Sequence, residues 1–143
     1  MRFRGYYDFL SNFYPCDIAI GGITFPSSEN AYHYFRTNDE DAKKKFIVLP
    51  PAGAKKLAKK CRTKPNWDEI KLGVMRYVCE QKFAQNSYLA LLLIDTLGET
   101  LIEHNWWGDT FWGVCNGIGE NHLGKILMDI RRMELNGKLR PSG

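Results

Sequence analysis

The most regular stretch of the chain is W-D-E-I-K-L-G-V-M-R-Y-V-C-E-Q-K, residues 67–82. Its apolar side chains Ile70, Val74, Met75 and Val78 follow the helical period and share one face. The pattern therefore predicts a helix over residues 67–82.

Shorter helices are predicted on both sides of this stretch. Ser27 and Ser28 have the side chains that favour a helix N-cap, and a helix over about 29–36 follows them. Other helices are expected over 40–46, 52–60, 87–97, where Gly98 ends the helix, and 121–134.

A small amount of β structure is predicted as well. The first 25 residues are expected to be strand and loop, with a hairpin whose arms, 17–20 and 23–25, are joined by Gly21-Gly22. Thr100–Glu103 is expected to be a short strand. The predicted fold class is α+β, a mainly helical single domain over residues 1–143 with a small β element.

Composition sets limits on function. The 143 residues are 44% hydrophobic and 25% charged, which is ordinary for one globular domain. A net charge of +4 permits an anionic substrate but falls short of the basic stripe of a dedicated nucleic-acid binder.

The sequence predicts no metal and no cofactor. The cysteines and histidines show no zinc-ligand spacing. They are Cys16, Cys61, Cys79, Cys115, His33, His104 and His122. The N-terminus lacks the apolar region of a signal peptide and no apolar run reaches membrane length, so a cytoplasmic protein with reduced thiols and no membrane partner is expected.

Lys71 stands out because it lies on the apolar stripe of the predicted helix, four residues after Trp67 and four before Met75. Its aliphatic stem could cover apolar surface while the ammonium reaches water. Alternatively, the lysine could lie in a pocket, where it would bind an anion or attack a sugar carbon as a free amine.

Glu29 opens a predicted helix. A carboxylate in a first turn is favoured by the helix dipole alone. Tyr32 and His33 follow on the same face, however, and a glutamate beside them could also be an acid, a base or a ribose ligand.

The stretch W-W-G-D-T-F-W-G, residues 106–113, is unusually aromatic for a loop. Its tryptophans indicate burial, an interface or a stacking platform. Asp109 could form an Asx turn or serve as a carboxylate in a partly dry site.

Two further stretches carry weaker signals. The glycine-rich run over 116–121 precedes a predicted helix and could present backbone N–H groups to a phosphate, although such turns are common. Lys55-Lys56 and Lys59-Lys60 form a basic face, which a solvated helix surface explains more simply.

Seven pieces of the sequence, in order along nearly the whole chain, resemble the NADAR superfamily, with the single-domain YbiA-like members as the nearest shape. The pieces are F-L-S-N-F-Y-P at 9–15; Phe25 with S-S-E-N-A-Y at 27–32; Trp67 with Lys71 and Met75; Lys82-Phe83 with Gln85-Asn86; Leu101 and Glu103; Asp109 with F-W-G at 111–113; and Gly119 with N-H-L-G at 121–124, Leu127-Met128 and Arg131.

The resemblance implies an N-glycosidase that acts on riboflavin-pathway intermediates or removes ADP-ribose from guanine. The implied partner is therefore a ribosylated, nucleotide-like small molecule or an ADP-ribosylated nucleic acid. It implies Glu29, Lys71 and Asp109 as catalytic residues. It further implies these substrate-binding residues: Asn12, Phe13, Tyr32, Arg36, Trp67, Trp112, Gly113 and Asn121.

The chain departs from the family pattern near Glu29. Members often carry histidine where this chain has Asn30, and small residues where it has Tyr34-Phe35 before Arg36. These departures bear on the substrate more than on the reaction.

Two mechanisms and two rival functions stay open at this point. A carboxylate could stabilise the ribose cation and orient water, or Lys71 could form a Schiff base with the sugar. The rivals are a non-catalytic ADP-ribose or NAD reader, and a nucleic-acid-binding module that uses Lys43–Lys45 and the Lys55–Lys60 face.

Overall fold

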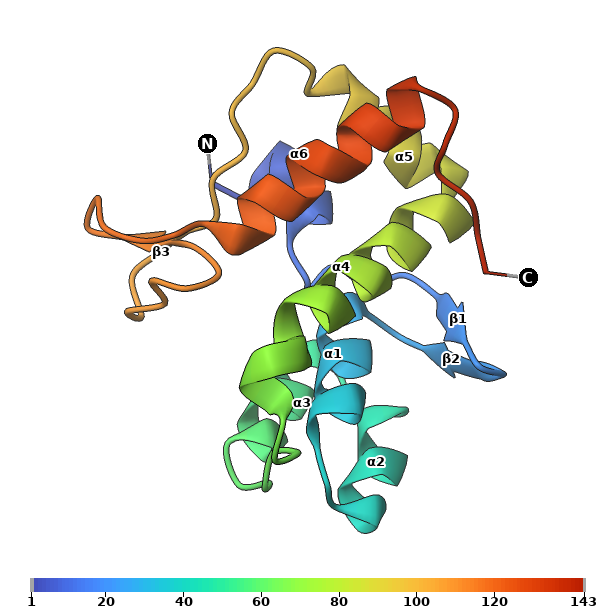
Figure 1. The fold of residues 1–143 in the computed structure, drawn as a ribbon, viewed down its shortest axis with the longest axis vertical. Coiled ribbons are helices and arrows are strands. Elements are labelled where there is room, and N and C mark those ends of the chain that lie inside the picture. The colour runs from blue at the N-terminus through green and yellow to red at the C-terminus, as the bar shows by residue number, and fades with distance from the viewer. Residues whose placement is uncertain (1, 143) are drawn as a thin grey trace. The chain divides into compact units, whose positions relative to one another are not determined.

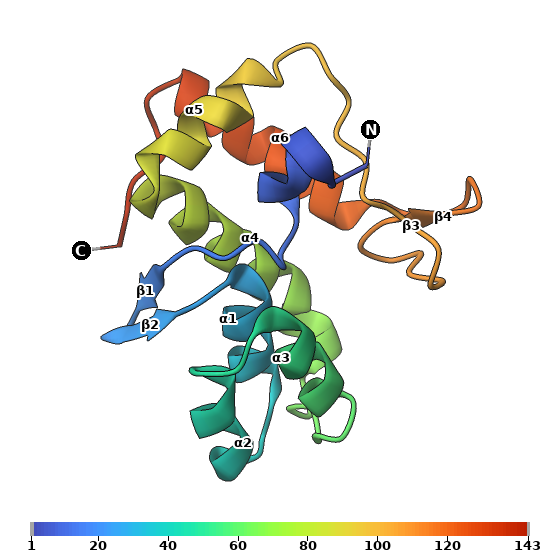
Figure 2. The ribbon, with the colours of Figure 1, turned by 180° about the vertical axis from the view of Figure 1, so that it is seen from behind.

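The computed structural model describes residues 2–142, which fall into two compact units. Unit 1 combines the N-terminal residues to Ser11 with Ser87–Leu139, and unit 2 combines Asn12–Asn86 with the residues from Arg140 onward. The chain is mainly helical with two small two-stranded sheets (Figures 1 and 2), so the predicted α+β class is confirmed. The single domain over residues 1–143 stays a prediction.

Unit 2 begins with the predicted hairpin. Strands β1 (Ile18–Ile20) and β2 (Ile23–Phe25) pair antiparallel. The turn needs Gly21 and Gly22 because both have positive φ angles, 59° and 81°, which residues with a Cβ rarely adopt.

Four helices complete unit 2: α1 (Ser28–Arg36), α2 (Glu40–Phe46), α3 (Pro51–Ala58) and α4 (Trp67–Gln85). Helix α1 contacts each of the other three, and β1 packs on α4. Phe25, Ala31 and Val78 form one buried cluster between these elements. The predicted stripe on α4 is confirmed, since Met75 and Val78 are buried and Ile70 and Val74 are half-buried.

The helix boundaries differ slightly from those expected. Helix α3 starts at Pro51, where a missing N–H costs nothing in a first turn. Helix α4 runs three residues past Lys82. The Asn86 side chain follows its last residue and donates to the carbonyl of Lys82 at 2.8 Å.

Unit 1 holds a 3-10 helix, η1 (Gly5–Leu10), and the helices α5 (Ser87–Asp95) and α6 (His122–Leu135). The prediction of strand and loop was wrong for Gly5–Leu10, whose Phe9 and Leu10 are buried. Helices α5 and α6 contact each other, and Arg131 donates from Nη1 to the carbonyl and hydroxyl of Thr96, both at 2.9 Å.

Strands β3 (His104–Asn105) and β4 (Val114–Cys115) form the parallel sheet of unit 1. The predicted strand over Thr100–Glu103 was therefore wrong. The Asn121 side chain occupies the backbone groups that a strand would need: its Oδ1 accepts from Glu103 N at 2.9 Å, and its Nδ2 donates to the Leu101 carbonyl at 3.0 Å.

Backbone segments pass very close together around Asn121. A Cβ on Gly113 would overlap Glu103, one on Gly119 would overlap the Gly113 carbonyl, and one on Gly124 would overlap the Leu101 carbonyl. These three glycines therefore allow the loop between β3 and α6 to fold against the start of α6.

Two further predictions concern the state of the cysteine thiols and membrane-spanning segments. All four cysteines are free, and burial raises the pKa of the Cys79 thiol to about 12. Within residues 2–142, no helix is long and apolar enough to span a membrane.

Two helical glycines provide a matched test of this packing. Gly124→Ala is expected to lower the free energy of unfolding by about 1–3 kcal/mol, because the added methyl overlaps the Leu101 carbonyl. Gly73→Ala in α4 meets nothing within 4 Å and should raise it by about 0.5–1 kcal/mol through helix propensity. Urea denaturation measures the free energy of unfolding of both variants. Equal changes would contradict the close packing of Gly124 against the Leu101 carbonyl.

Candidate active site

The candidate site in unit 2 is built on the first turn of α1. The Ser27 hydroxyl accepts from the backbone N–H of Asn30 at 3.1 Å and donates to its Oδ1 at 2.5 Å. This is the N-cap that the sequence predicts, and it fixes where the helix begins.

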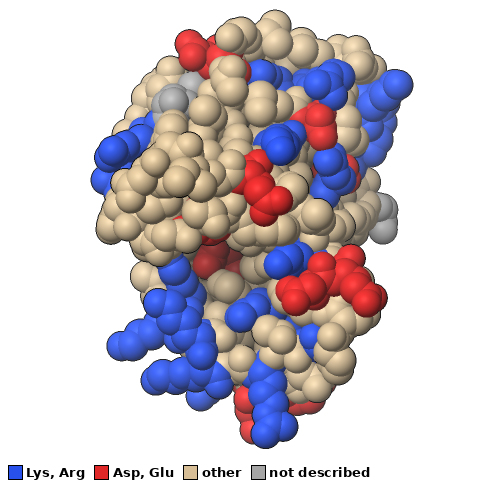
Figure 3. All heavy atoms as spheres, turned by 60° about the vertical axis from the view of Figure 1, so that its left-hand side comes forward, with Lys and Arg blue, Asp and Glu red and all other residues tan. Residues whose placement is uncertain are grey.

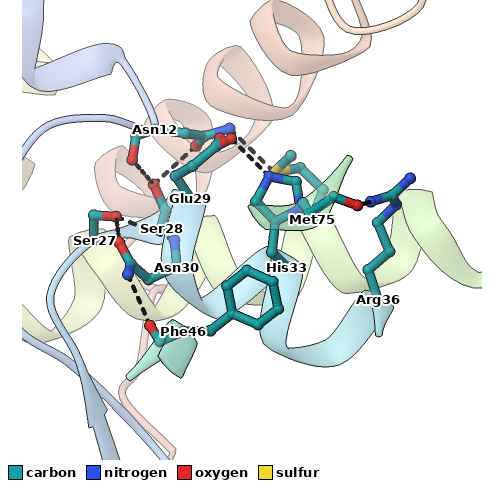
Figure 4. A network of polar contacts seen from close by, with 10 residues as sticks. Asn12, Ser27, Ser28, Glu29, Asn30, His33, Arg36, Phe46 and Met75 are labelled. Atoms are coloured by element: carbon teal, nitrogen blue, oxygen red, sulfur yellow. Dashed lines mark hydrogen bonds and ion pairs between the residues drawn. The ribbon is translucent and has the colours of Figure 1, made fainter. Parts of the chain in front are cut away.

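Asn30, the residue that departs from the family pattern, is fully buried. Its Nδ2 donates to the carbonyl of Phe46 at 2.7 Å (Figure 4) and to the carbonyl of Leu49 at 2.8 Å. Phe46 is the last residue of α2 and Leu49 follows in the next turn of the chain, so Asn30 ties α1 to the end of α2. Tyr34 and Phe35 likewise pack on Phe25, at ring distances of 5.0 and 6.0 Å.

Asn12 fixes the same turn from the other side. Its backbone carbonyl accepts from Glu29 N at 2.9 Å, and its Oδ1 accepts from the Ser28 hydroxyl at 2.8 Å. Its Nδ2 lies 3.5 Å from the Met75 sulfur on α4. The predicted substrate-binding residue Asn12 is thus a buried link between the start of α1 and α4, and its contact with substrate stays a prediction.

Glu29 lies on this fixed turn with its side chain only 12% exposed. Oε2 is 2.7 Å from Nε2 of His33, one helical turn further on (Figure 4). Among residues 2–142, no hydrogen bond reaches Oε1. One carboxylate oxygen is therefore held, and the other is open to a reactant.

His33 is the residue that the predicted site did not include. The signal was present in the sequence, because positions 29 and 33 are four apart and lie on one helix face. What the sequence could not give is burial: the His33 side chain is 11% exposed, and its Nδ1 is buried with no hydrogen-bond partner in the described part of the chain.

Lys71 has its side chain 23% exposed, in agreement with a place at the edge of the apolar stripe. Its Nζ lies 3.2 Å from Oδ1 of Asp68, which is well exposed. Lys71 therefore takes part in an ion pair as an ammonium. Attack on a sugar carbon would require this contact to break and the nitrogen to lose a proton.

The other predicted residues of unit 2 differ in exposure. Trp67 is 5% exposed and meets Tyr32 edge to face at 5.2 Å, so this pair packs as core. Arg36 donates from Nη1 to the Ala58 carbonyl at 3.2 Å, and Phe13 is exposed with Lys55 Nζ 5.6 Å from its ring. Their contact with substrate stays a prediction.

Asp109 lies in unit 1, where its carboxylate forms the Asx turn considered from the sequence. Its Oδ1 accepts from the backbone N–H groups of Phe111 at 3.1 Å and Trp112 at 2.9 Å. Asn105 closes the same loop by bonding both backbone groups of Asp109, at 2.8 and 3.0 Å. The turn is thus confirmed, and a catalytic role for Asp109 stays a prediction.

The remaining predicted residues of unit 1 have clear structural tasks. Trp112 is half-buried and meets Phe111 edge to face at 4.8 Å. Gly113 and Asn121 belong to the close backbone packing at the start of α6, and Asn121 has a positive φ of 54°. Substrate contact by these residues also stays a prediction.

A basic surface covers part of unit 2. Basic side chains gather in the lower part of the view in Figure 3, the part where Figure 1 draws α2 and α3. Between Asp41 and Asp68 the sequence holds no acidic residue, and Lys56, Lys59 and Lys60 are exposed. Across the described residues, no group of three or more His, Cys, Asp or Glu side chains could hold a metal ion.

Comparison with known proteins shows the family of this chain. The NADAR domain model matches residues 2–135, so the chain belongs to the NADAR family. The expectation drawn from the sequence motifs is confirmed.

Several relatives match most of the chain. The N-glycosidase YbiA of Shigella sonnei is 38% identical over 133 residues, which cover 87% of this chain and 80% of that protein. An N-glycosidase of Nostoc punctiforme is 32% identical over 136 residues, covering 87% and 84%. A riboflavin biosynthesis protein of Vibrio vulnificus is 37% identical over 127 residues, and this chain spans 34% of its length.

The fold agrees with these matches. The NMR structure of E. coli YbiA aligns with a TM-score of 0.85 at 29% identity, covering all of this chain and 89% of that one. N-glycosidases are hydrolases that act on N-glycosyl bonds, and the NADAR relatives reported above include enzymes of this name.

Two substitutions separate the turn from the charge at Asp109. Asp109→Asn keeps an oxygen that accepts from Phe111 and Trp112, so the melting temperature should match that of the wild type. Asp109→Ala removes both bonds and should cost about 1 kcal/mol in the free energy of unfolding. If Asp109→Asn is as unstable as Asp109→Ala, the turn does not depend on the oxygen. If Asp109→Asn is as stable as the wild type, it removes the charge alone and can be used to test catalysis.

Proposed function

We propose that this protein hydrolyses the N-glycosidic bond between a base, or a base-like amine, and the ribose of a ribose phosphate or of ADP-ribose. The observation that carries the proposal is the Glu29 carboxylate, mostly buried, bonded through one oxygen to His33 and anchored on the first turn of α1. The names of the related N-glycosidases and of the riboflavin biosynthesis protein support the same reaction class.

The chemistry requires stabilisation of a cation. As the bond between the sugar C1 and the base nitrogen breaks, its electron pair leaves with the nitrogen and positive charge develops on the ribose. A carboxylate close to C1 stabilises that charge, and it can accept a proton from the water whose oxygen attacks C1. The departing nitrogen takes up one proton from the solvent, and Glu29 later returns its proton to the solvent, so that one water in total supplies OH to C1 and H to the nitrogen. The open oxygen of Glu29 is our candidate for both carboxylate tasks.

Lys71 is proposed to act as a cation. Lys71 pairs with Asp68 as a charged ammonium group. This group would bind a substrate phosphate or a developing negative charge. A Schiff base would need the free amine, so the electrostatic role is the simpler of the two mechanisms. Asp109 lies in unit 1, and a catalytic role for its carboxylate is proposed separately, on the family resemblance.

A substrate carried on nucleic acid is the second candidate, and the basic surface over α2 and α3 is the observation that favours it. Phosphate contacts by such lysines would make binding weaken steeply with salt. A pure reader of ADP-ribose would use the same residues without turnover.

The test is release of free base, detected by mass spectrometry, from a ribosylaminopyrimidine 5′-phosphate and from ADP-ribosylated guanine. Wild-type protein should release base from at least one of them. Glu29→Gln should lower the rate at least ~10²-fold, in the range that general acid–base groups supply, with an unchanged melting temperature.

Glu69→Gln is the matched control, because Glu69 is an exposed glutamate of unit 2 and lies on α4. It should leave the rate unchanged. Binding without base release by wild-type protein would show a reader instead of an enzyme, and full activity of Glu29→Gln would remove Glu29 from the mechanism. In the same assay Lys71→Arg should retain activity, whereas a borohydride-trapped adduct on Lys71 would establish the Schiff base.

A further inference from the structure

His33 is the one residue whose side chain has a buried nitrogen or oxygen atom with no hydrogen-bond partner anywhere in residues 2–142. That atom is Nδ1, and the other ring nitrogen lies 2.7 Å from Glu29. We propose that His33 is a positioning residue for Glu29: it donates from Nε2 to Oε2 and thereby turns Oε1 toward the reacting sugar. The inference rests on the proposed function of Glu29.

The contacts of the ring select its tautomer. With the hydrogen on Nε2, the ring donates to a carboxylate, and a single lone pair on Nδ1 is left without a partner. With the hydrogen on Nδ1, a lone pair would face the carboxylate and a donor would be buried without an acceptor. The second arrangement carries two unfavourable terms, so the geometry selects the first.

The surroundings hold the imidazole in this orientation. Its ring is 5.9 Å from the ring of Phe46 on α2 and meets Tyr32 edge to face at 5.4 Å. Because Glu29 and His33 are one turn apart on the same helix, their spacing is also fixed by the backbone of α1. The hydrogen bond is thus set before any substrate binds.

Stability alone does not account for histidine at this position. Leaving Nδ1 buried without a partner costs free energy. A methionine would fill similar space among Tyr32 and Phe46 without a polar atom to satisfy. A residue that is costly for the fold and bonded to a candidate catalytic carboxylate is therefore assigned to the reaction.

The consequence for the chemistry concerns orientation. The hydrogen bond from Nε2 limits rotation of the carboxylate and so holds Oε1 in one position relative to the ribose cation.

The experiment compares two substitutions of His33 in the base-release assay. His33→Met removes the donor at similar volume, and kcat should fall about 10- to 100-fold with little change in KM, as expected for a misplaced catalytic group. His33→Gln retains an N–H donor on the same helix face and should recover most of that loss. A merely structural histidine would lower the melting temperature of both variants and would not split them in kcat.

A double substitution shows whether His33 acts through Glu29. If it does, His33→Met added to Glu29→Gln should lower kcat no further than Glu29→Gln alone. A further full loss would mean that His33 acts independently, which overturns the proposal.

A second measurement needs no turnover. Nitrogen-15 chemical shifts of the histidine ring in wild-type protein at neutral pH should show the hydrogen on Nε2 of His33, and a hydrogen on Nδ1 would overturn the proposal. If Glu29→Gln is inactive while His33→Met keeps its kcat, the inference about His33 fails and the proposed function survives. If Glu29→Gln is fully active, the role of Glu29 fails instead.

Discussion

The first turn of α1 depends on side-chain hydrogen bonds that are buried together. Ser27 caps the helix, Asn30 binds the carbonyl of Phe46 at the end of α2, and Asn12 binds both Glu29 N and the Ser28 hydroxyl. Buried amides and hydroxyls are costly unless they are paired, so each of these bonds excludes other positions of the turn. Glu29 is therefore placed by its neighbours, and its side chain needs only one further bond, to His33, to be oriented.

Unit 1 uses a different device for a similar purpose. Close passage of backbone segments, which Gly113, Gly119 and Gly124 permit, holds the loop between β3 and α6, and Asn121 satisfies the backbone of the passing segment. Asp109 and Asn105 then shape the tip of the loop through bonds to backbone groups. Residues that family resemblance associates with substrate thus have structural tasks as well. A loss of activity on substitution must for that reason be compared with stability.

The helices and the hairpin of unit 2 could be predicted because their signals are local. A serine cap, a Gly-Gly turn and the apolar period of α4 each fix an element from a few adjacent residues. The absence of a strand at 100–103 could not be predicted, since it depends on a residue distant in the sequence, Asn121, which bonds to Leu101. The 3-10 helix at Gly5–Leu10 was missed as well.

The site shows the same division. Glu29, and the placement of Lys71 beside the apolar stripe, could be inferred from spacing on a helix. The ion pair of Lys71 with Asp68, the burial of Trp67 and the orphan nitrogen of His33 could not, because spacing does not determine the depth at which a side chain lies. Spacing predicts which residues share a helix face, and packing determines how deeply each of them is buried.

The central claim is that ribose binds at the start of α1, and amide chemical shifts measured by NMR test it most directly. During a titration with ribose 5-phosphate, the amides of residues 29–33 should shift and saturate, because the open oxygen of Glu29 faces the sugar. The same titration of His33→Met should give similar saturation, since this variant alters orientation of the carboxylate more than binding. Saturating shifts confined to the lysines of α2 and α3, with residues 29–33 unchanged, would contradict the account.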